Sequence, residues 1–198
     1  MGTLYLDEAV LPVPPRSKEY FRGTARQFLL EEAPEHLQEP SRLDLVKLLD
    51  TGLPKRGIHV FPADKTTLGC REGATGLSDD GAVNILLEKS VYNAVCSGPL
   101  LDTRARSTCG HEIIHALEHV DALRKELASA NELGLSRVAR ADLKPYEDPE
   151  WQAWCGAGCL LVPLETLATV RHLPERKIAS LYGVSVKFLR SHRKRFNI

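Results

Sequence analysis

The chain has 198 residues, and its 26 Lys and Arg are balanced by 26 Asp and Glu, so the formal net charge is zero. A neutral balance gives the chain as a whole no general affinity for nucleic acid or for an acidic membrane surface. The sequence has no run of about 18 apolar residues that could span a membrane and no signal peptide. Its five cysteines are an odd number without Cys-x-x-Cys spacing. We therefore expect a cytoplasmic protein with reduced thiols, formed by one full domain and a small additional unit.

The N-terminal part of the chain is predicted to be mainly helical. A Pro-rich stretch over residues 11–17 is expected to be extended. Two segments then carry apolar side chains at helical spacing. The first covers residues 17–33 and the second residues 40–54, where Gly52 and Pro54 end the helix.

A small sheet is predicted next. Residues 57–64 read as one short strand and residues 82–87 as another, with an Asp-Asp-Gly turn at residues 79–81 before the second strand. The sheet therefore precedes the helix that carries the candidate site.

That helix contains the sequence His-Glu-Ile-Ile-His, from His111 to His115. At 100° per residue, His115 lies about 40° from His111 and Glu112 about 100° from it, while the apolar side chains lie on the opposite side. Two imidazoles one turn apart can share an ion at about 2.0–2.1 Å. Glu112 is placed to take a proton from a water on that ion and to pass it to a leaving amine. The pattern predicts His111 and His115 as metal ligands and Glu112 as the catalytic base; the alternative is a surface helix with solvated histidines.

A further histidine, His119, lies on the same side of this helix. It is about 12 Å along the axis from His111, and no glycine breaks the helix between them. We therefore interpret His119 as a residue that supports a ligand or caps the helix, and not as a third ligand.

A catalytic zinc site needs a third protein ligand, and the candidates are the acidic residues further along the chain. Residues 131–136 resemble a thermolysin-type motif only incompletely, and we reject them. Residues 148–163 have the signals of a helix, with Asp148 as its N-cap. Glu150 lies in its first turn, where it is either a ligand or an ordinary acid favoured by the helix dipole. The full candidate set is Glu118, Glu126, Glu132, Asp142, Glu147, Asp148 and Glu150.

Two groups of residues resemble the motifs of the ImmA/IrrE metallo-endopeptidases. The resemblance implies that Glu150 is the third zinc ligand beside His111 and His115, that Zn²⁺ or Mn²⁺ is the metal, and that the substrate is a partner protein, a repressor. The matching residues are Arg106, Thr108, His111, Glu112, His115 and His119 in the first motif, and Glu150, Ala153, Ala157, Leu160, Leu161 and Pro163 in the second.

The chain departs from these motifs at several positions. Ile114 replaces a glycine and Trp154 an asparagine, and we expect both to reshape the walls of the cleft. The segment over residues 127–146 is long and is expected to form a lid or a substrate-binding loop. Its last residue, Tyr146, either donates to an oxyanion or only packs. The other departures are Ser107 for Phe, Gly110 for Ala and Gly158 for Ala.

The C-terminal segment has the spacing of a helix-turn-helix, with Ala179 in the first helix, Gly183 in the turn and Ser185 as the cap of the second. A basic stretch follows from Arg190 to Arg195. It could touch DNA phosphates, and packing or substrate recruitment is an equal alternative.

Together these features predict an α+β, zincin-like minimal metallopeptidase fold over residues 1–165, followed by a helix-turn-helix-like unit over residues 166–198. The predicted function is that of a zinc-dependent endopeptidase that cleaves a repressor in a stress or mobile-element response. The alternative function is that of a DNA-binding regulator with a metal-sensing or vestigial peptidase site.

Overall fold

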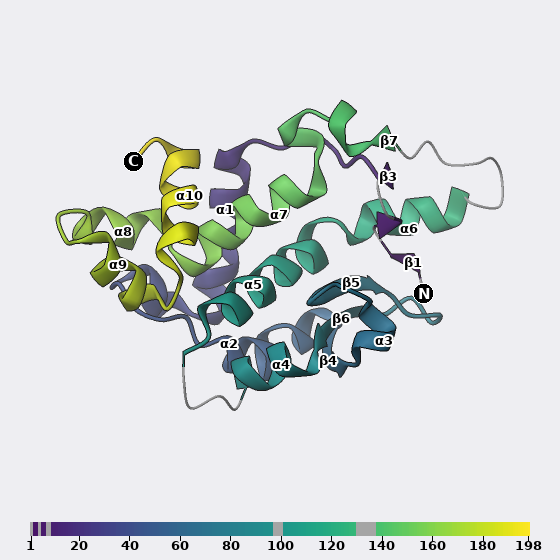
Figure 1. Cartoon of the computed structure of the whole chain (residues 1–198), viewed down its shortest axis with the longest axis horizontal. Coiled ribbons are helices and arrows are strands. Elements are labelled where there is room, and N and C mark those ends of the chain that lie inside the picture. Colours follow the sequence, from purple (N-terminus) through teal and green to yellow (C-terminus); the bar gives the residue numbers. More distant parts are fainter. Residues whose placement is uncertain (1, 4, 7–8, 97–100, 130–137) are drawn as a thin grey trace.

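The computed structural model describes residues 2–3, 5–6, 9–96, 101–129 and 138–198 (Figure 1). Helices and strands are both present, which confirms the predicted α+β class. The helices are α1 (Lys18–Glu32), α2 (Leu45–Lys47), α3 (Lys65–Leu68), α4 (Lys89–Cys96), α5 (Thr103–Glu118), α6 (Val120–Ser129), α7 (Pro149–Leu161), α8 (Leu164–Val170), α9 (Glu175–Tyr182) and α10 (Val186–Phe196). The strands are β1 (Gly2–Thr3), β2 (Tyr5–Leu6), β3 (Ala9–Val10), β4 (Ile58–Ala63), β5 (Gly73–Leu77), β6 (Val83–Glu88) and β7 (Val138–Ala139).

The larger sheet has the strand order β1-β5-β6-β4. β4 runs parallel to β6, with Ile58 opposite Val83, and β5 runs antiparallel to β6, with Thr75 opposite Ile85. β2, β3 and β7 form a second, antiparallel sheet. The predicted strands over residues 57–64 and 82–87 are confirmed as β4 and β6. β5 is not predicted from the sequence, because Gly-Ala-Thr-Gly-Leu lacks the apolar alternation and side-chain bulk that favour a strand.

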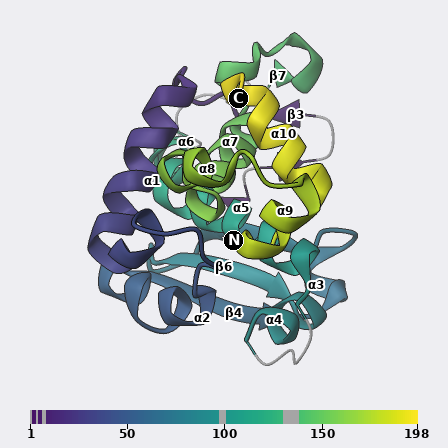
Figure 2. The same ribbon diagram turned by 90° about the vertical axis from the view of Figure 1, so that its left-hand side faces the viewer.

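α5 lies between the larger sheet and a helical layer that contains α1 and α7 (Figures 1 and 2). The buried apolar side chains of these layers form one continuous cluster, which includes Phe28, Ile85, Ile113 and Leu161. Within the described residues, no single helix is long and apolar enough to cross a membrane; α7 and α8 meet that test only as a pair bent by 58°. The helix that carries the His-Glu-Ile-Ile-His sequence is therefore held on both sides by the core.

The first predicted helix is confirmed as α1, whose N-cap Ser17 accepts a hydrogen bond from the backbone of Tyr20 at 3.1 Å. The second was expected to cover residues 40–54 and differs from that expectation. α2 starts only at Leu45, continues as a π-turn over Leu48–Gly52 and then as a 3₁₀ turn over Pro54–Arg56. Pro54 was predicted to end the helix, but it is the first residue of the 3₁₀ turn. Proline suits this place because the first residue of a helical turn needs no N–H donor.

Two glycines allow α5 and α7 to approach each other closely. A Cβ added at Gly110 would lie 3.0 Å from Leu161 Cδ1, and one added at Gly156 would lie 2.8 Å from Ile114 Cγ2. The side chain of Ile114, on α5, therefore fills the space that Gly156, on α7, leaves because it has no side chain. This close packing brings the predicted ligand residues of the two helices together.

The C-terminal helices pack against the same core. His192 of α10 is fully buried, its Nε2 donates to the carbonyl of Val162 at 3.0 Å, and its Nδ1 occupies the space above Gly158. Burial lowers the pKa of His192 to about 4. Arg106 of α5 donates to the carbonyl of Gly183, which has a φ of 65° in the turn between α9 and α10. The boundary after residue 165 and the helix-turn-helix identity of α9 and α10 stay predictions.

Candidate metal centre

Three side chains predicted as metal ligands meet between α5 and α7. His111 and His115 lie one turn apart on α5, and Glu150 reaches them from the first turn of α7. Their ligand atoms lie within 4.8 Å of one another. His115 Nε2 is 2.9 Å from His111 Nε2 and 3.1 Å from Glu150 Oε1, and His111 Nε2 is 3.4 Å from the same oxygen. The helical periodicity thus placed the two histidines on one face, and α7 supplies a carboxylate to that face.

This arrangement fits a divalent metal ion. Ligands at about 2.0–2.1 Å from a tetrahedral ion lie about 3.3–3.4 Å apart, close to the separations of these three donors. Burial raises the pKa of Glu150, but the imidazoles of His111 and His115 beside it outweigh burial and hold the pKa far below its usual range. The carboxylate is therefore ionised at neutral pH, as a ligand must be. Two imidazoles and one carboxylate form a donor set found in catalytic zinc sites.

His115 is oriented by hydrogen bonds on the side away from Glu150. Its Nδ1 lies 2.8 Å from His119 Nδ1, and His119 Nε2 lies 3.0 Å from Gln152 Oε1. Burial lowers the pKa of His119 to about 3, so this ring is neutral at pH 7. His119 is also the C-cap residue of α5. His119 thus contacts a candidate ligand and also caps α5, the two roles between which the sequence left the choice open.

His111 is held by packing and not by a hydrogen bond to Nδ1. Its ring lies 4.3 Å from the Trp154 ring, centroid to centroid, with an interplanar angle of 40°. Among the described residues, its buried Nδ1 has no hydrogen-bond partner. The ring of Trp154 in turn packs against that of Phe188 on α10, with 6.3 Å between the ring centroids. Trp154 thus forms a wall beside the metal ligand, as expected from its replacement of a smaller residue.

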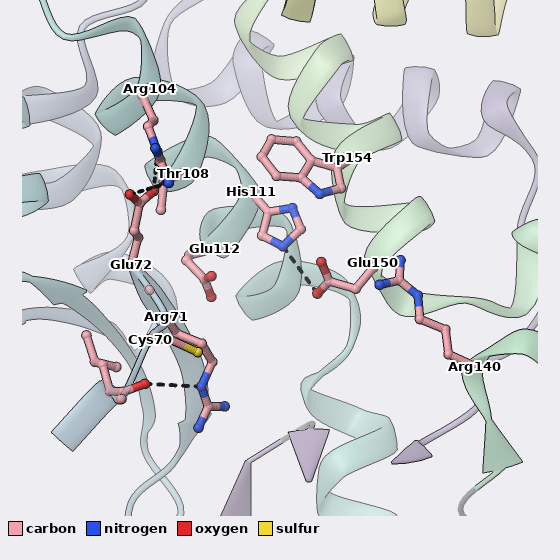
Figure 3. A pocket seen from close by; sticks show the side chains of 13 residues that line it. Cys70, Arg71, Glu72, Arg104, Thr108, His111, Glu112, Arg140, Glu150 and Trp154 are labelled. Atoms are coloured by element: carbon pink, nitrogen blue, oxygen red, sulfur yellow. Dashed lines mark hydrogen bonds and ion pairs between the residues drawn. The ribbon is translucent and has the colours of Figure 1, made fainter. Parts of the chain in front are cut away.

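Glu112 lines the same cleft as His111 and Glu150 (Figure 3). Its Oε2 accepts a hydrogen bond of 2.8 Å from the hydroxyl of Thr75 on β5. A Cβ at Gly73 would lie 2.7 Å from Glu112 Cγ, so the strand leaves room for the carboxylate only because residue 73 is a glycine. The cleft has a volume of about 630 Å³. It is large enough for an extended stretch of a few residues beside the carboxylate.

Charged pairs border this cleft. Arg104 binds Glu72 at 2.7 Å, and Arg140 binds Asp148 at 2.9 Å. Asp148 is the N-cap of α7 and accepts from the backbone N–H of Glu150 at 3.0 Å. Arg140 and Asp148 therefore help to position the first turn that presents the third candidate ligand.

The other acidic candidates whose side chains the structure describes do not reach the candidate metal site. Glu118 binds Arg16 and the hydroxyl of Tyr20, Glu147 accepts from the backbone of Lys144, and Asp142 lies outside the cleft. The side chains of Glu126 and Glu132, and the rejected segment 131–136, lie outside the described residues.

The segment predicted as a lid or substrate-binding loop, residues 127–146, is described only in part. Arg140 from its second half lines the cleft. Tyr146 does not: its side chain is exposed, and its carbonyl accepts a hydrogen bond from Gln152. The structure therefore does not bring the hydroxyl of Tyr146 to the candidate site.

Three residues around the site escaped the sequence analysis as parts of it. Thr75 lies on the strand that was not predicted, so no signal pointed to it. Gln152 lies two residues after Glu150 in a helix that was predicted, but its contact to His119 depends on how α5 and α7 pack. Gly73 matters to the site only because the side chain of Glu112 packs directly against it, where a Cβ would not fit. All three are tertiary features that periodicity within one helix does not reveal.

Comparison with known proteins agrees with the motifs. Residues 100–192 match the profile of the family Peptidase_M78, described as the IrrE N-terminal-like domain. This match confirms the resemblance to the ImmA/IrrE metallopeptidases. A search of curated proteins gave no match.

Proposed function

We propose that this chain, which matches the IrrE N-terminal-like domain family over residues 100–192, is a zinc-dependent endopeptidase. Its substrate is a specific partner protein, a helix-turn-helix repressor whose cleavage starts a stress or mobile-element response. The observation that carries the proposal is the convergence of His111, His115 and Glu150 at a cleft that Glu112 also lines.

The metal of this site is proposed to be Zn²⁺, with Mn²⁺ as the alternative. His111, His115 and Glu150 would hold it through two nitrogens and one oxygen, which suits zinc. When bound, zinc polarises a carbonyl and lowers the pKa of water, so that hydrolysis proceeds at neutral pH.

Glu112 acts as the general base and later as the general acid. Its carboxylate takes a proton from the attacking water as the oxygen bonds to the peptide carbon, and then delivers that proton to the amide nitrogen as the C–N bond breaks and the amine leaves. Thr75 keeps one carboxylate oxygen in place through its hydrogen bond. The other oxygen, Oε1, lies on the side of Gly73.

The choice of a repressor as substrate rests on the family resemblance. The cleft itself supports a polypeptide substrate, because it is lined by residues 68–73, which lead into β5, and bordered by charged residues. Trp154 narrows it beside His111, which favours a substrate presented in one orientation by its own fold.

The test combines metal analysis with cleavage. Purified wild-type protein, Glu112→Gln and Glu150→Ala are compared by elemental analysis and by incubation with candidate helix-turn-helix repressors. We expect Glu112→Gln to keep its metal and lose at least 10²-fold of the cleavage rate, and Glu150→Ala to lose both. Full metal content in Glu150→Ala would remove this residue from the ligand set, and full cleavage by Glu112→Gln would refute the peptidase mechanism.

A second function is favoured by the surface of α10. Lys187, Arg190 and Lys194 are exposed on this helix, whereas His192 of the same basic stretch is buried. This surface suits a DNA-binding regulator with a metal-sensing or vestigial site. If Glu112→Gln leaves the biological response unchanged and Lys187→Glu with Arg190→Glu abolishes it, the regulator replaces the peptidase.

A further inference from the structure

The side-chain amide of Gln152 has a defined orientation. Its Nε2 donates to two main-chain carbonyls, Pro14 O at 2.9 Å and Tyr146 O at 2.7 Å. If the amide were rotated by 180°, its oxygen would face both carbonyl oxygens. Neither contact would then have a hydrogen-bond donor. The residue is fully buried, so water does not compensate for such a loss. Oε1 of Gln152 must therefore be the atom that faces His119.

The orientation of this amide decides which nitrogen of His119 carries the proton. Oε1 only accepts, so His119 Nε2, 3.0 Å away, must donate. A neutral imidazole has one N–H, and the Nδ1 of His119 is then an acceptor.

The same logic continues to His115. Its Nδ1 lies 2.8 Å from the Nδ1 of His119, and since the latter accepts, His115 Nδ1 must donate. The proton of a neutral His115 is then on Nδ1, and the lone pair is on Nε2. That is the nitrogen that faces His111 and Glu150.

We propose that Gln152 is a positioning residue that selects the metal-binding tautomer of His115, acting through His119. This proposal rests on the metal site of the proposed function and extends it by a relay of three residues, Gln152, His119 and His115. The relay starts at main-chain carbonyls and ends at His115, where it favours the proton on Nδ1 and so leaves the lone pair of Nε2 for a metal.

The two histidine ligands are therefore prepared in different ways. His111 has no corresponding partner on Nδ1 among the described residues and is held by the Trp154 ring. Packing fixes the plane of a ring but not the position of its proton. We accordingly assign the tautomer selection in this site to His115 alone.

The first test is the tautomer itself. Long-range ¹H–¹⁵N spectra of the metal-free protein at pH 7.5, with ¹⁵N-labelled histidine, distinguish protonation at Nδ1 from protonation at Nε2. We expect His115 to carry its proton on Nδ1 and His119 on Nε2. The opposite assignment for either ring in the wild-type protein overturns the proposal, and this measurement needs no variant.

The second test is the zinc affinity of Gln152→Met, measured by competition with a chelator. Methionine matches the length of glutamine but gives His119 no strong acceptor, so the tautomers of His119 and His115 are no longer selected. Loss of a hydrogen bond that supports a ligand typically lowers metal affinity 10- to 100-fold, and we expect at least a 10-fold loss here.

A matched background separates tautomer selection from a merely structural role of Gln152. In His119→Asp, a carboxylate accepts from His115 Nδ1 whatever residue stands at position 152. Adding Gln152→Met to that background is expected to change zinc affinity less than twofold. An equal loss in both backgrounds would show that Gln152 only ties segments together, and would overturn the relay. Failure of the proposed function looks different: a missing metal site would leave the wild-type protein without zinc at His111, His115 and Glu150, and a wrong peptidase mechanism would leave cleavage by Glu112→Gln intact, whatever the effect of Gln152→Met on zinc affinity.

Discussion

Gly158→Ala is expected to destabilise the protein, although alanine is the better helix former. A Cβ at this position in α7 would lie 2.2 Å from Nδ1 and 2.9 Å from Cγ of His192. Ordinary contacts begin near 3.4 Å, so the ring must move by about 1.2 Å, the difference between 3.4 and 2.2 Å. The ring has no room to do so while its Nε2 donates to the carbonyl of Val162 at 3.0 Å.

The magnitude follows from three opposing contributions. Overpacking in a core costs about 1–3 kcal/mol, and loss of the hydrogen bond from His192 costs about 1 kcal/mol. The change from glycine to alanine inside a helix stabilises the folded state by about 1 kcal/mol. The free energy of unfolding should therefore fall by about 1–3 kcal/mol. In a His192→Ala background the same change should raise it by about 1 kcal/mol, because only the helix preference remains.

Urea unfolding followed by circular dichroism measures both effects. The wild-type protein, each single variant and the double variant form a double-mutant cycle, from which we expect a coupling energy of about 2–4 kcal/mol. If Gly158→Ala changes the free energy of unfolding by less than 0.5 kcal/mol in the wild-type background, the ring does not occupy this space and the reasoning fails.

Three further predictions concern the site and its surroundings. Gly73→Ala should lower the cleavage rate at least tenfold and leave the metal content unchanged, because its Cβ would displace Glu112; Gly23→Ala, which contacts nothing, is the control. Trp154→Ala should weaken zinc binding several-fold in chelator competition, since the His111 ring loses its packing partner, and an unchanged affinity would refute that role. The pKa of His192 is about 4 in the folded state and about 6.5 when exposed, so its folding contribution is complete above pH 6.5 and is lost as the pH falls toward 4. Between pH 7 and pH 4.5, the free energy of unfolding should fall by about 2–3 kcal/mol more in the wild type than in His192→Gln. An equal pH dependence of the two proteins would contradict a buried neutral ring.

The sequence predicted the parts of the site that lie within one helix. A turn of α5 fixes the angle between His111 and His115 whatever surrounds it, so helical periodicity was sufficient to place them on one face. Glu150 was different. Its position relative to α5 depends on the approach of α7, and only the family resemblance distinguished it from other acidic residues.

The parts that were missed depend on contacts between elements. β5 is a strand because it pairs with β6 on one side and β1 on the other, and not because of its own composition. The helix expected over residues 40–54 breaks into short irregular turns, since tertiary packing overrides local preference there. Two departures from the family motifs, Ile114 and Gly158, have their explanation on neighbouring helices, in Gly156 and His192.

The carbonyls of Pro14 and Tyr146 that hold the Gln152 amide belong to the main chain. Any residue offers the same oxygen, so these two positions can vary in identity without effect on the amide. The length of the chain around them cannot vary in the same way. Inserting or deleting one residue in either segment would move its carbonyl oxygen too far from Gln152 Nε2 for a hydrogen bond. The candidate metal centre therefore constrains the length of two segments, and a comparison of amino-acid types at those positions would not reveal this constraint.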